Sequence, residues 1–317
     1  MTYIALAQNR LPPPRWYSLV NNGNWNPSLH VDVVQKCSLE RCLKIIRFLS
    51  QNFKNRKRRT MQGLDFTKII PVVTGGGSGI GYGLVYEFIK RGCPKVLITG
   101  RRENVLQAAA AKHQGKIFYK VSDAGKATDR VDLLKWVETE HPDCNALVNN
   151  AGVMRCIAPV EDNGSWEERA AEIEINLGGP VHLCTLFIPY LLKKKETALI
   201  ANVTSGLAFV PYAAGPVYSA TKFALHSYTM SMRYSLQDTN VRMIEIIPPA
   251  VKSNLGGSHD FGEECDEFCE HVMKRVEAGE EEVGFNISEK ARLAGRKVLD
   301  EMMVTLAQNM HVKKYPA

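Results

Sequence analysis

The sequence lacks the features that would place it in a membrane, secreted or repeat class. No apolar run reaches the ~18 to 20 residues that a membrane-spanning helix needs. No compact apolar stretch follows a basic start, so no secretory signal peptide is expected. Residues 68–317 contain no internal repeat and no low-complexity linker. The 317 residues are therefore expected to form one domain of ordinary size with an extension.

Acidic residues are almost missing from the first part of the chain. Residues 1–60 hold 11 Lys and Arg against two acids, a net charge of +9. The whole chain carries +7, so the remainder carries −2 (+7 less +9). The basic character therefore belongs to the extension, and nucleic-acid binding is not expected for the core domain.

Residues 1–65 are predicted to be a basic extension that is either disordered or a targeting segment. A transit peptide would place the protein in mitochondria, and without one we expect a cytoplasmic protein. The basic run at 54–59 leaves membrane binding, nucleic-acid binding and nuclear import open, although membrane attachment is not expected. Translation that starts at Met61 would remove the segment altogether.

Cysteine spacing typical of a disulfide framework or a zinc site is also missing. The eight cysteines are scattered, mostly in apolar stretches where Cys behaves as a small buried hydrophobe. Cys265 and Cys269, with His259 and His271, allow a metal site as an alternative. However, Cys-x3-Cys is not a common zinc spacing and the surrounding acids indicate a solvated helix, so no metal is predicted.

From residue 68 onward, short apolar runs alternate with helical patterns. The runs of strand length are Ile69–Val73, Lys95–Thr99, Lys116–Val121, Ala146–Val148, Ala198–Val203 and Val241–Ile247. The helical stretches are Ile80–Arg91, Glu103–Lys112, Asp129–Glu140, Glu167–Leu192, Val217–Leu236 and Glu289–Asn309. This alternation predicts an α/β fold with a parallel sheet that helices cover on both faces.

Two details of the strands need separate treatment. Pro71 would remove a ladder N–H from the first strand, so that strand either begins at Val72 or is irregular. No seventh strand is predicted near the C-terminus. Residues 66–317 are predicted to form one domain, in which residues 252–285, acidic in part, are interpreted as a lid.

A glycine-rich loop, Thr74–Gly81, follows the first strand and opens a helix. A pyrophosphate group needs backbone N–H groups that no Cβ obstructs, and it gains from the positive end of a helix. This position between a strand and a helix favours dinucleotide binding over an ordinary turn. The candidate cofactor-binding residues here are Gly75, Ser78, Gly79, Ile80 and Gly81.

The second strand ends at Gly100-Arg101-Arg102, with two cations and no acid. An NAD site usually offers a carboxylate here to the ribose 2′-hydroxyl, whereas an NADP site offers a cation to the 2′-phosphate. NADP(H) is therefore the preferred cofactor, and NAD(H) stays an alternative.

Tyr218 and Lys222 lie four residues apart in a helical pattern, which places them on one helix face. A nearby ammonium lowers the pKa of a phenol, and this makes tyrosine a usable acid/base. Ser205, at the end of the fifth strand, offers a hydroxyl to a substrate oxygen. Alone, each motif is common, but here they follow the glycine loop in order.

Together with Asn149–Gly152 and Asn176, these motifs closely resemble the short-chain dehydrogenase/reductase family over residues 68–256. The resemblance implies a doubly wound, Rossmann-like sheet and a homo-oligomer. It implies catalytic roles for Asn176, Ser205, Tyr218 and Lys222, with Asn176 holding a water of a proton relay and Lys222 bonding the nicotinamide ribose. It also implies cofactor contacts from Asp123, Asn150, Ala151, Gly152, Tyr218, Lys222 and Val251.

The function predicted on this basis is an NADP(H)-dependent oxidoreductase that interconverts a small-molecule alcohol and carbonyl by hydride transfer. The alternative is a cofactor-binding sensor or scaffold without turnover, which the fold alone does not exclude. The complete set of Asn, Ser, Tyr and Lys favours the enzyme, because a sensor does not need an activated tyrosine.

Overall fold

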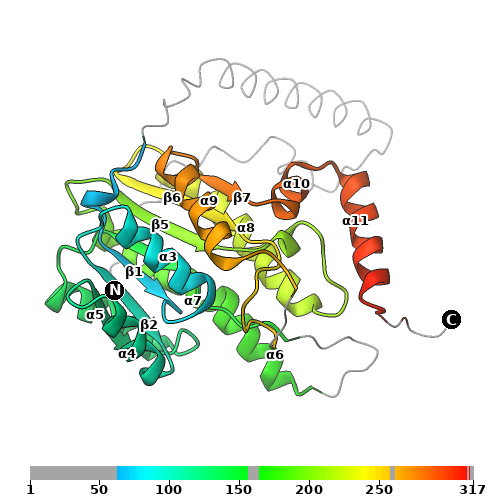
Figure 1. Ribbon diagram of the computed structural model, residues 1–317, viewed down its shortest axis with the longest axis horizontal. Coiled ribbons are helices and arrows are strands. Elements are labelled where there is room, and N and C mark those ends of the chain that lie inside the picture. Colours follow the sequence, from blue (N-terminus) through cyan, green and yellow to red (C-terminus); the bar gives the residue numbers. More distant parts are fainter. Residues whose placement is uncertain (1–62, 156–163, 258–260, 313, 315–317) are drawn as a thin grey trace, which may run out of the picture. The chain divides into compact units, whose positions relative to one another are not determined.

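The computed structural model describes residues 63–155, 164–257, 261–312 and 314 (Figure 1). The basic run 54–59, the rest of 1–62, Cys156 and His259 lie outside the described residues. No helix within the described ranges is both long enough and apolar enough to cross a membrane.

A parallel sheet of seven strands forms the centre of the molecule (Figure 1). Its spatial order is β3-β2-β1-β4-β5-β6-β7, and every neighbouring pair is parallel. The strands are β1 (Pro71–Thr74), β2 (Val96–Gly100), β3 (Ile117–Val121), β4 (Ala146–Asn149), β5 (Ala198–Val203), β6 (Val241–Ile247) and β7 (Glu282–Gly284). The order reverses at β1, so the predicted doubly wound, Rossmann-like fold is confirmed.

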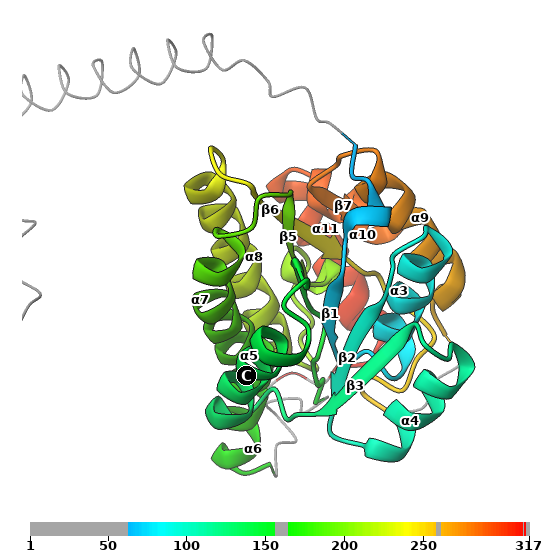
Figure 2. The same ribbon diagram turned by 90° about the vertical axis from the view of Figure 1, so that its left-hand side faces the viewer.

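Helices cover both faces of the sheet, as Figure 2 shows. The helices α5 (Ala127–Glu140), α7 (Gly179–Leu191) and α8 (Pro216–Leu236) lie on one face, and their apolar side chains form one core cluster. The helices α3 (Gly79–Lys90), α4 (Glu103–Lys112) and α9 (Cys265–Glu277) cover the other face around a second cluster. The remaining helices are α6 (Trp166–Ile173), α10 (Ile287–Leu293) and α11 (Arg296–Asn309).

Pro71 is the first residue of β1, a position at which proline is tolerated. The preceding residue, Ile70, accepts the N–H groups of Asn145 and Ala146 with its carbonyl. Its own N–H donates to the Asn145 side chain at 2.8 Å. Asn145 thus supplies hydrogen bonds just before the start of β1. The regular pairing of the strand therefore does not need the N–H that Pro71 lacks. The strand therefore begins at Pro71, two residues after the start of the apolar run and one residue before the predicted start at Val72.

The prediction that the chain lacks a seventh strand is wrong. The strand β7 pairs with β6 through three residues, with Val283 opposite Ile246. A strand this short has no measurable alternation, so its sequence offered no signal above that of a loop. Its parallel pairing extends the sheet beyond β6, and α10 packs beside it.

Part of the predicted lid is also wrong, because residues 265–277 form α9. Its residues Phe268, Val272 and Met273 are buried in the core that α3 shares. Its acidic residues face outward. The acids therefore belong to the solvated face of an amphipathic core helix, and residues 252–257 and 261–264 remain candidates for a lid.

Candidate active site

The loop between β1 and α3 exposes backbone N–H groups at the first turn of a helix. Gly75 and Gly79 have φ values of +66° and +53°, the left-handed region that favours glycine. A Cβ on Gly81 would lie 2.2 Å from the Gly75 carbonyl oxygen. Gly81 is therefore required for the close approach of α3 to the loop, and the arrangement fits a pyrophosphate.

Thr74 and Asn150 join the ends of β1 and β4, where the strand order reverses. The Thr74 hydroxyl accepts the N–H groups of Asn150 and Ala151, each at 3.0 Å. The Asn150 amide donates back to the Thr74 carbonyl at 2.9 Å. Asn150 thus joins the ends of the two central strands, and Thr74 is a partner that sequence reasoning missed.

Cations lie at the exposed end of β2, beside the glycine loop. Arg101 and Arg102 are both exposed, and Arg102 donates to the Ser78 hydroxyl at 3.3 Å. At the end of β3, the Asp123 carboxylate accepts the Gly125 N–H at 3.0 Å. The structure therefore brings Ser78 and Arg102 together beside the glycine loop, and a hydrogen bond to the Asp123 carboxylate orders the turn at Asp123–Gly125.

Ser205, Tyr218 and Lys222 come together from β5 and α8. Ser205 directly follows Thr204 at the end of β5, and its hydroxyl accepts the Leu207 N–H at 3.1 Å. The same hydroxyl also forms a side-chain hydrogen bond with the Tyr218 phenol. Lys222 donates to the Val203 carbonyl at 2.9 Å and lies 5.6 Å from the centre of the Tyr218 ring. All three side chains are buried.

Asn176 is fully buried in a π-helical turn, Glu174–Gly178, between α6 and α7. Both polar atoms of its side chain bind the Val153 backbone, at 2.9 Å to N and 2.8 Å to O. Gly152 lies beside it, where an added Cβ would be 3.3 Å from the Asn176 amide oxygen. Asn176 therefore fixes the loop after β4, and the predicted water contact stays a prediction.

Burial dominates the electrostatics of this cluster. Burial raises the pKa of the Tyr218 phenol, the Ser205 hydroxyl acts in the opposite direction, and the Glu172 carboxylate raises it further. Burial lowers the pKa of Lys222 to about 8. The expected lowering of the Tyr218 pKa by Lys222 does not arise from the chain alone, because both groups favour their neutral forms in an apolar setting.

Val251 is buried just beyond β6 and forms a parallel bridge with Glu263. Two backbone bonds of 2.9 Å, from Lys252 N to Glu263 O and from Glu263 N to Ala250 O, close the base of the loop between them. This pairing holds Val251 at the carboxyl edge of the sheet, on the same side as the glycine loop.

A family model described as short chain dehydrogenase matches residues 69–263. The chain belongs to the short-chain dehydrogenase family. Its relatives include an uncharacterized oxidoreductase, DltE, of Bacillus subtilis, which is 37% identical over 238 residues, 73% of this chain and 93% of the relative. The NADP-dependent 3-hydroxy acid dehydrogenase YdfG of Escherichia coli K12 is 30% identical over 183 residues, 58% of this chain and 73% of that protein.

Solved structures agree with this assignment. A short-chain dehydrogenase from Novosphingobium aromaticivorans superposes with a TM-score of 0.66 at 26% identity, covering 80% of this chain and 90% of the other. An alcohol dehydrogenase from Thermococcus sibiricus, complexed with 5-hydroxy-NADP, gives 0.61 at 25% identity, with coverage of 68% and 95%. This short-chain dehydrogenase is thus an oxidoreductase of a family that acts on CH–OH and C=O groups of small molecules.

Sequence reasoning about this short-chain dehydrogenase missed two buried carboxylates near the cluster of Ser205, Tyr218 and Lys222. Glu172 lies one turn before Asn176 and accepts the Arg155 N–H at 3.1 Å, and burial raises its pKa. Glu245 is fully buried in β6. A single acid inside the apolar run Val241–Ile247 was the available signal for Glu245, because an unpaired charge is seldom buried.

Proposed function

We propose that this chain is an NADP(H)-dependent enzyme that interconverts an alcohol and a carbonyl, with Tyr218 as its acid/base. The observation that supports this most strongly is the meeting of Ser205, Tyr218 and Lys222 in one buried cluster at the carboxyl end of the sheet. The glycine loop lies at the same edge, where α/β proteins bind their ligands.

The donor set fits NADP(H). The loop at Gly75–Gly81 offers N–H groups to the pyrophosphate, and Arg101 and Arg102 offer guanidinium groups to the 2′-phosphate. Lys222 would hold the nicotinamide ribose and Val251 the carboxamide. The NADP-dependent relative and the NADP-containing structural neighbour support this preference.

Bound nicotinamide would supply or take up the hydride. The chain's own residues would bind the substrate oxygen and transfer its proton. Ser205 donates its hydroxyl hydrogen to that oxygen and orients the carbonyl. Tyr218 then gives its phenolic proton to the oxygen as the carbon gains the hydride, and it takes the proton back in the oxidation direction. A charged Lys222 next to the phenolate would lower the cost of that proton transfer.

Turnover with a carbonyl panel tests this function. We expect NADPH oxidation with at least one member of a panel of aldehydes, ketones and 3-oxo esters, the last chosen because a relative acts on 3-hydroxy acids. The assay should follow nicotinamide absorbance on the full chain. Tight NADPH binding without turnover on any member would contradict the proposal and favour a cofactor sensor.

A further inference from the structure

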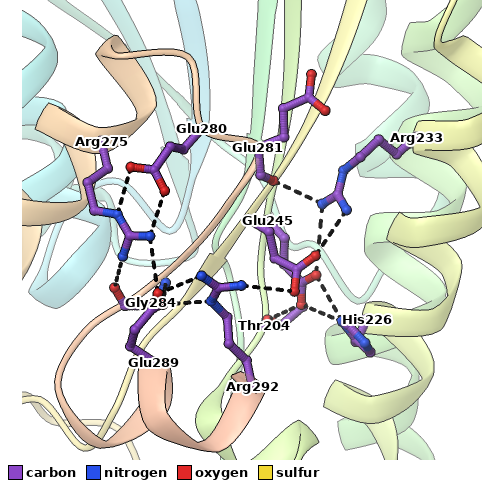
Figure 3. Close-up of polar contacts among 11 residues, drawn as sticks. Thr204, His226, Arg233, Glu245, Arg275, Glu280, Glu281, Gly284, Glu289 and Arg292 are labelled. Atoms are coloured by element: carbon purple, nitrogen blue, oxygen red, sulfur yellow. Dashed lines mark hydrogen bonds and ion pairs between the residues drawn. The ribbon is translucent and has the colours of Figure 1, made fainter. Parts of the chain in front are cut away.

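The face of α8 that carries the catalytic residues continues beyond them as a row of polar side chains. Tyr218 and Lys222 are followed at helical spacing by His226 and Arg233. Figure 3 shows His226 and Arg233 pointing from α8 toward Glu245 on β6. The proposed catalytic pair and this group therefore share one helix face, one turn apart.

Glu245 has no solvent exposure, and its carboxylate is satisfied by side chains alone. The Thr204 hydroxyl donates to it at 2.7 Å, and His226 Nδ1 lies 2.9 and 3.0 Å from its two oxygens. The Arg233 guanidinium is 4.0 Å away. A buried carboxylate is costly unless it is paired and hydrogen-bonded, so these contacts constrain β5, β6 and α8 together.

The group contacts both ends of the segment 205–209. At one end, Thr204 directly precedes Ser205, and its N–H donates to the Ile246 carbonyl at 2.9 Å. At the other end, the Phe209 ring packs edge-on against the His226 ring, with centroids 4.7 Å apart. Glu245 and His226 therefore fix the place from which Ser205 approaches Tyr218.

We propose that Glu245 and His226 are positioning residues of this enzyme: through Thr204 and Phe209 they set the Ser205 hydroxyl against the Tyr218 phenol, and protonated His226 holds the productive arrangement. The inference rests on the function proposed above for Ser205 and Tyr218. Neither positioning residue touches the reacting atoms, so their effect should appear in kcat and its pH dependence.

The direction of the pH effect follows from the charges around His226. These are Glu245 on β6, Glu282 on β7 and Arg233 on α8. The hydrogen bond to Glu245 raises the pKa of His226 above its usual 6.5, and burial and Arg233 oppose this shift. The stabilisation that the charged His226 imidazolium gains from these contacts is therefore fully present below pH 6.5 and is lost as the pH rises through the raised pKa of His226.

Substitution of Thr204 tests the connection to Ser205. Thr204→Val keeps the shape of the side chain but removes the donor to Glu245, and we expect kcat for NADPH-dependent carbonyl reduction to fall about tenfold. Thr204→Ser, which keeps the hydroxyl, should remain within about twofold of the wild type. The KM for NADPH should not change, because the contact lies on the substrate side of the site.

Substitution of His226 tests the pH dependence. His226→Gln keeps a hydrogen-bond donor but cannot carry charge, so its kcat should be about threefold or more below wild type at pH 6. The difference should disappear at a pH above the raised pKa of His226. The matched control is His141→Gln, which removes a buried histidine at the C-terminal cap of α5. In this variant the ratio of its kcat to that of the wild type should not depend on pH.

The outcomes separate this inference from the proposed function. Loss of turnover in Tyr218→Phe, with unchanged kcat and parallel pH profiles in Thr204→Val and His226→Gln, would overturn the inference alone. Full turnover in Tyr218→Phe, or no turnover by the wild type, would overturn the proposed function and this inference with it. Should Thr204→Val fail to fold, the pH-dependent ratio for His226→Gln decides the question.

Discussion

At the scale of single residues, the surroundings of a side chain decide its chemistry more than its spacing does. Tyr190 and Lys194 repeat the i, i+4 spacing of Tyr218 and Lys222, and the Lys194 ammonium donates to the Tyr190 hydroxyl at 2.7 Å. Tyr190 also donates to the Cys144 carbonyl, before the amino end of β4. That pair therefore lies at the edge of the sheet opposite to the glycine loop. It serves as an internal control for the effect of the Tyr-Lys spacing alone.

The proposed preference for NADP(H) also depends on single residues. Arg102→Ser removes the guanidinium next to Ser78, and we expect the Kd for NADPH to rise about tenfold or more, since a hydrogen bond to a charged group contributes about 1.5–3 kcal/mol. The Kd for NADH should stay within about twofold. Titration followed by nicotinamide fluorescence measures both values.

The matched control for this experiment is Arg296→Ser, which removes an exposed arginine paired with Asp300 on α11 and should leave both constants unchanged. Equal weakening of NADPH and NADH by Arg102→Ser would show that Arg102 does not recognise the 2′-phosphate. Tighter binding of NADH than NADPH by the wild type would contradict the cofactor preference itself.

Site residues that belong to a local sequence motif could be predicted. Site residues whose role depends on a partner far away in the sequence could not. Gly75 and Gly81 are recognisable because the turn and the helix contact at that spacing admit no side chain. Thr74 has no such signature, since its role depends on Asn150, which is 76 positions away. The same holds for Glu172, whose carboxylate accepts the backbone N–H of Arg155, 17 positions away.

At the scale of elements, the six longer strands were predictable and the smaller ones were not. Near-continuous apolar runs identify buried parallel strands, and Pro71 was correctly recognised as a boundary problem. The strand β7 is too short for periodicity, and its place is set by pairing with β6. In α9, the many acidic residues indicated a solvated segment, whereas the apolar spacing of Phe268, Val272 and Val276 indicates a core helix.

The placement of α9 in the core gives a prediction about stability. Phe268→Ala should lower the free energy of unfolding by about 3–5 kcal/mol, because the ring is fully buried between α3 and the sheet. Urea denaturation measures this change, and Phe223→Ala, at an exposed ring of α8, is the control with an expected change within about 0.5 kcal/mol. An unchanged midpoint for Phe268→Ala would mean that α9 is a detachable lid.

At the scale of the whole molecule, the sheet gathers residues from distant parts of the sequence at one edge. The ends of β1 and β4 carry the cofactor loop and Asn150, and the ends of β5 and β6 carry Ser205 and Val251. The helix α8 then brings Tyr218 and Lys222 over the same edge. Topology thus converts a linear order of motifs into a single site, and this is why the joint pattern was informative when each motif was not.

The most direct test of the account is the turnover of Tyr218→Phe compared with Tyr190→Phe, using NADPH and the best carbonyl of the panel. We predict that Tyr218→Phe lowers kcat at least ~100-fold, the lower end of what a positioned acid/base contributes, with little change in the Kd for NADPH. Tyr190→Phe should lose stability but keep its kcat, since its hydroxyl contacts the Pro142 and Cys144 carbonyls and the Lys194 ammonium, all away from the proposed site. Near wild-type turnover in Tyr218→Phe would contradict the central claim.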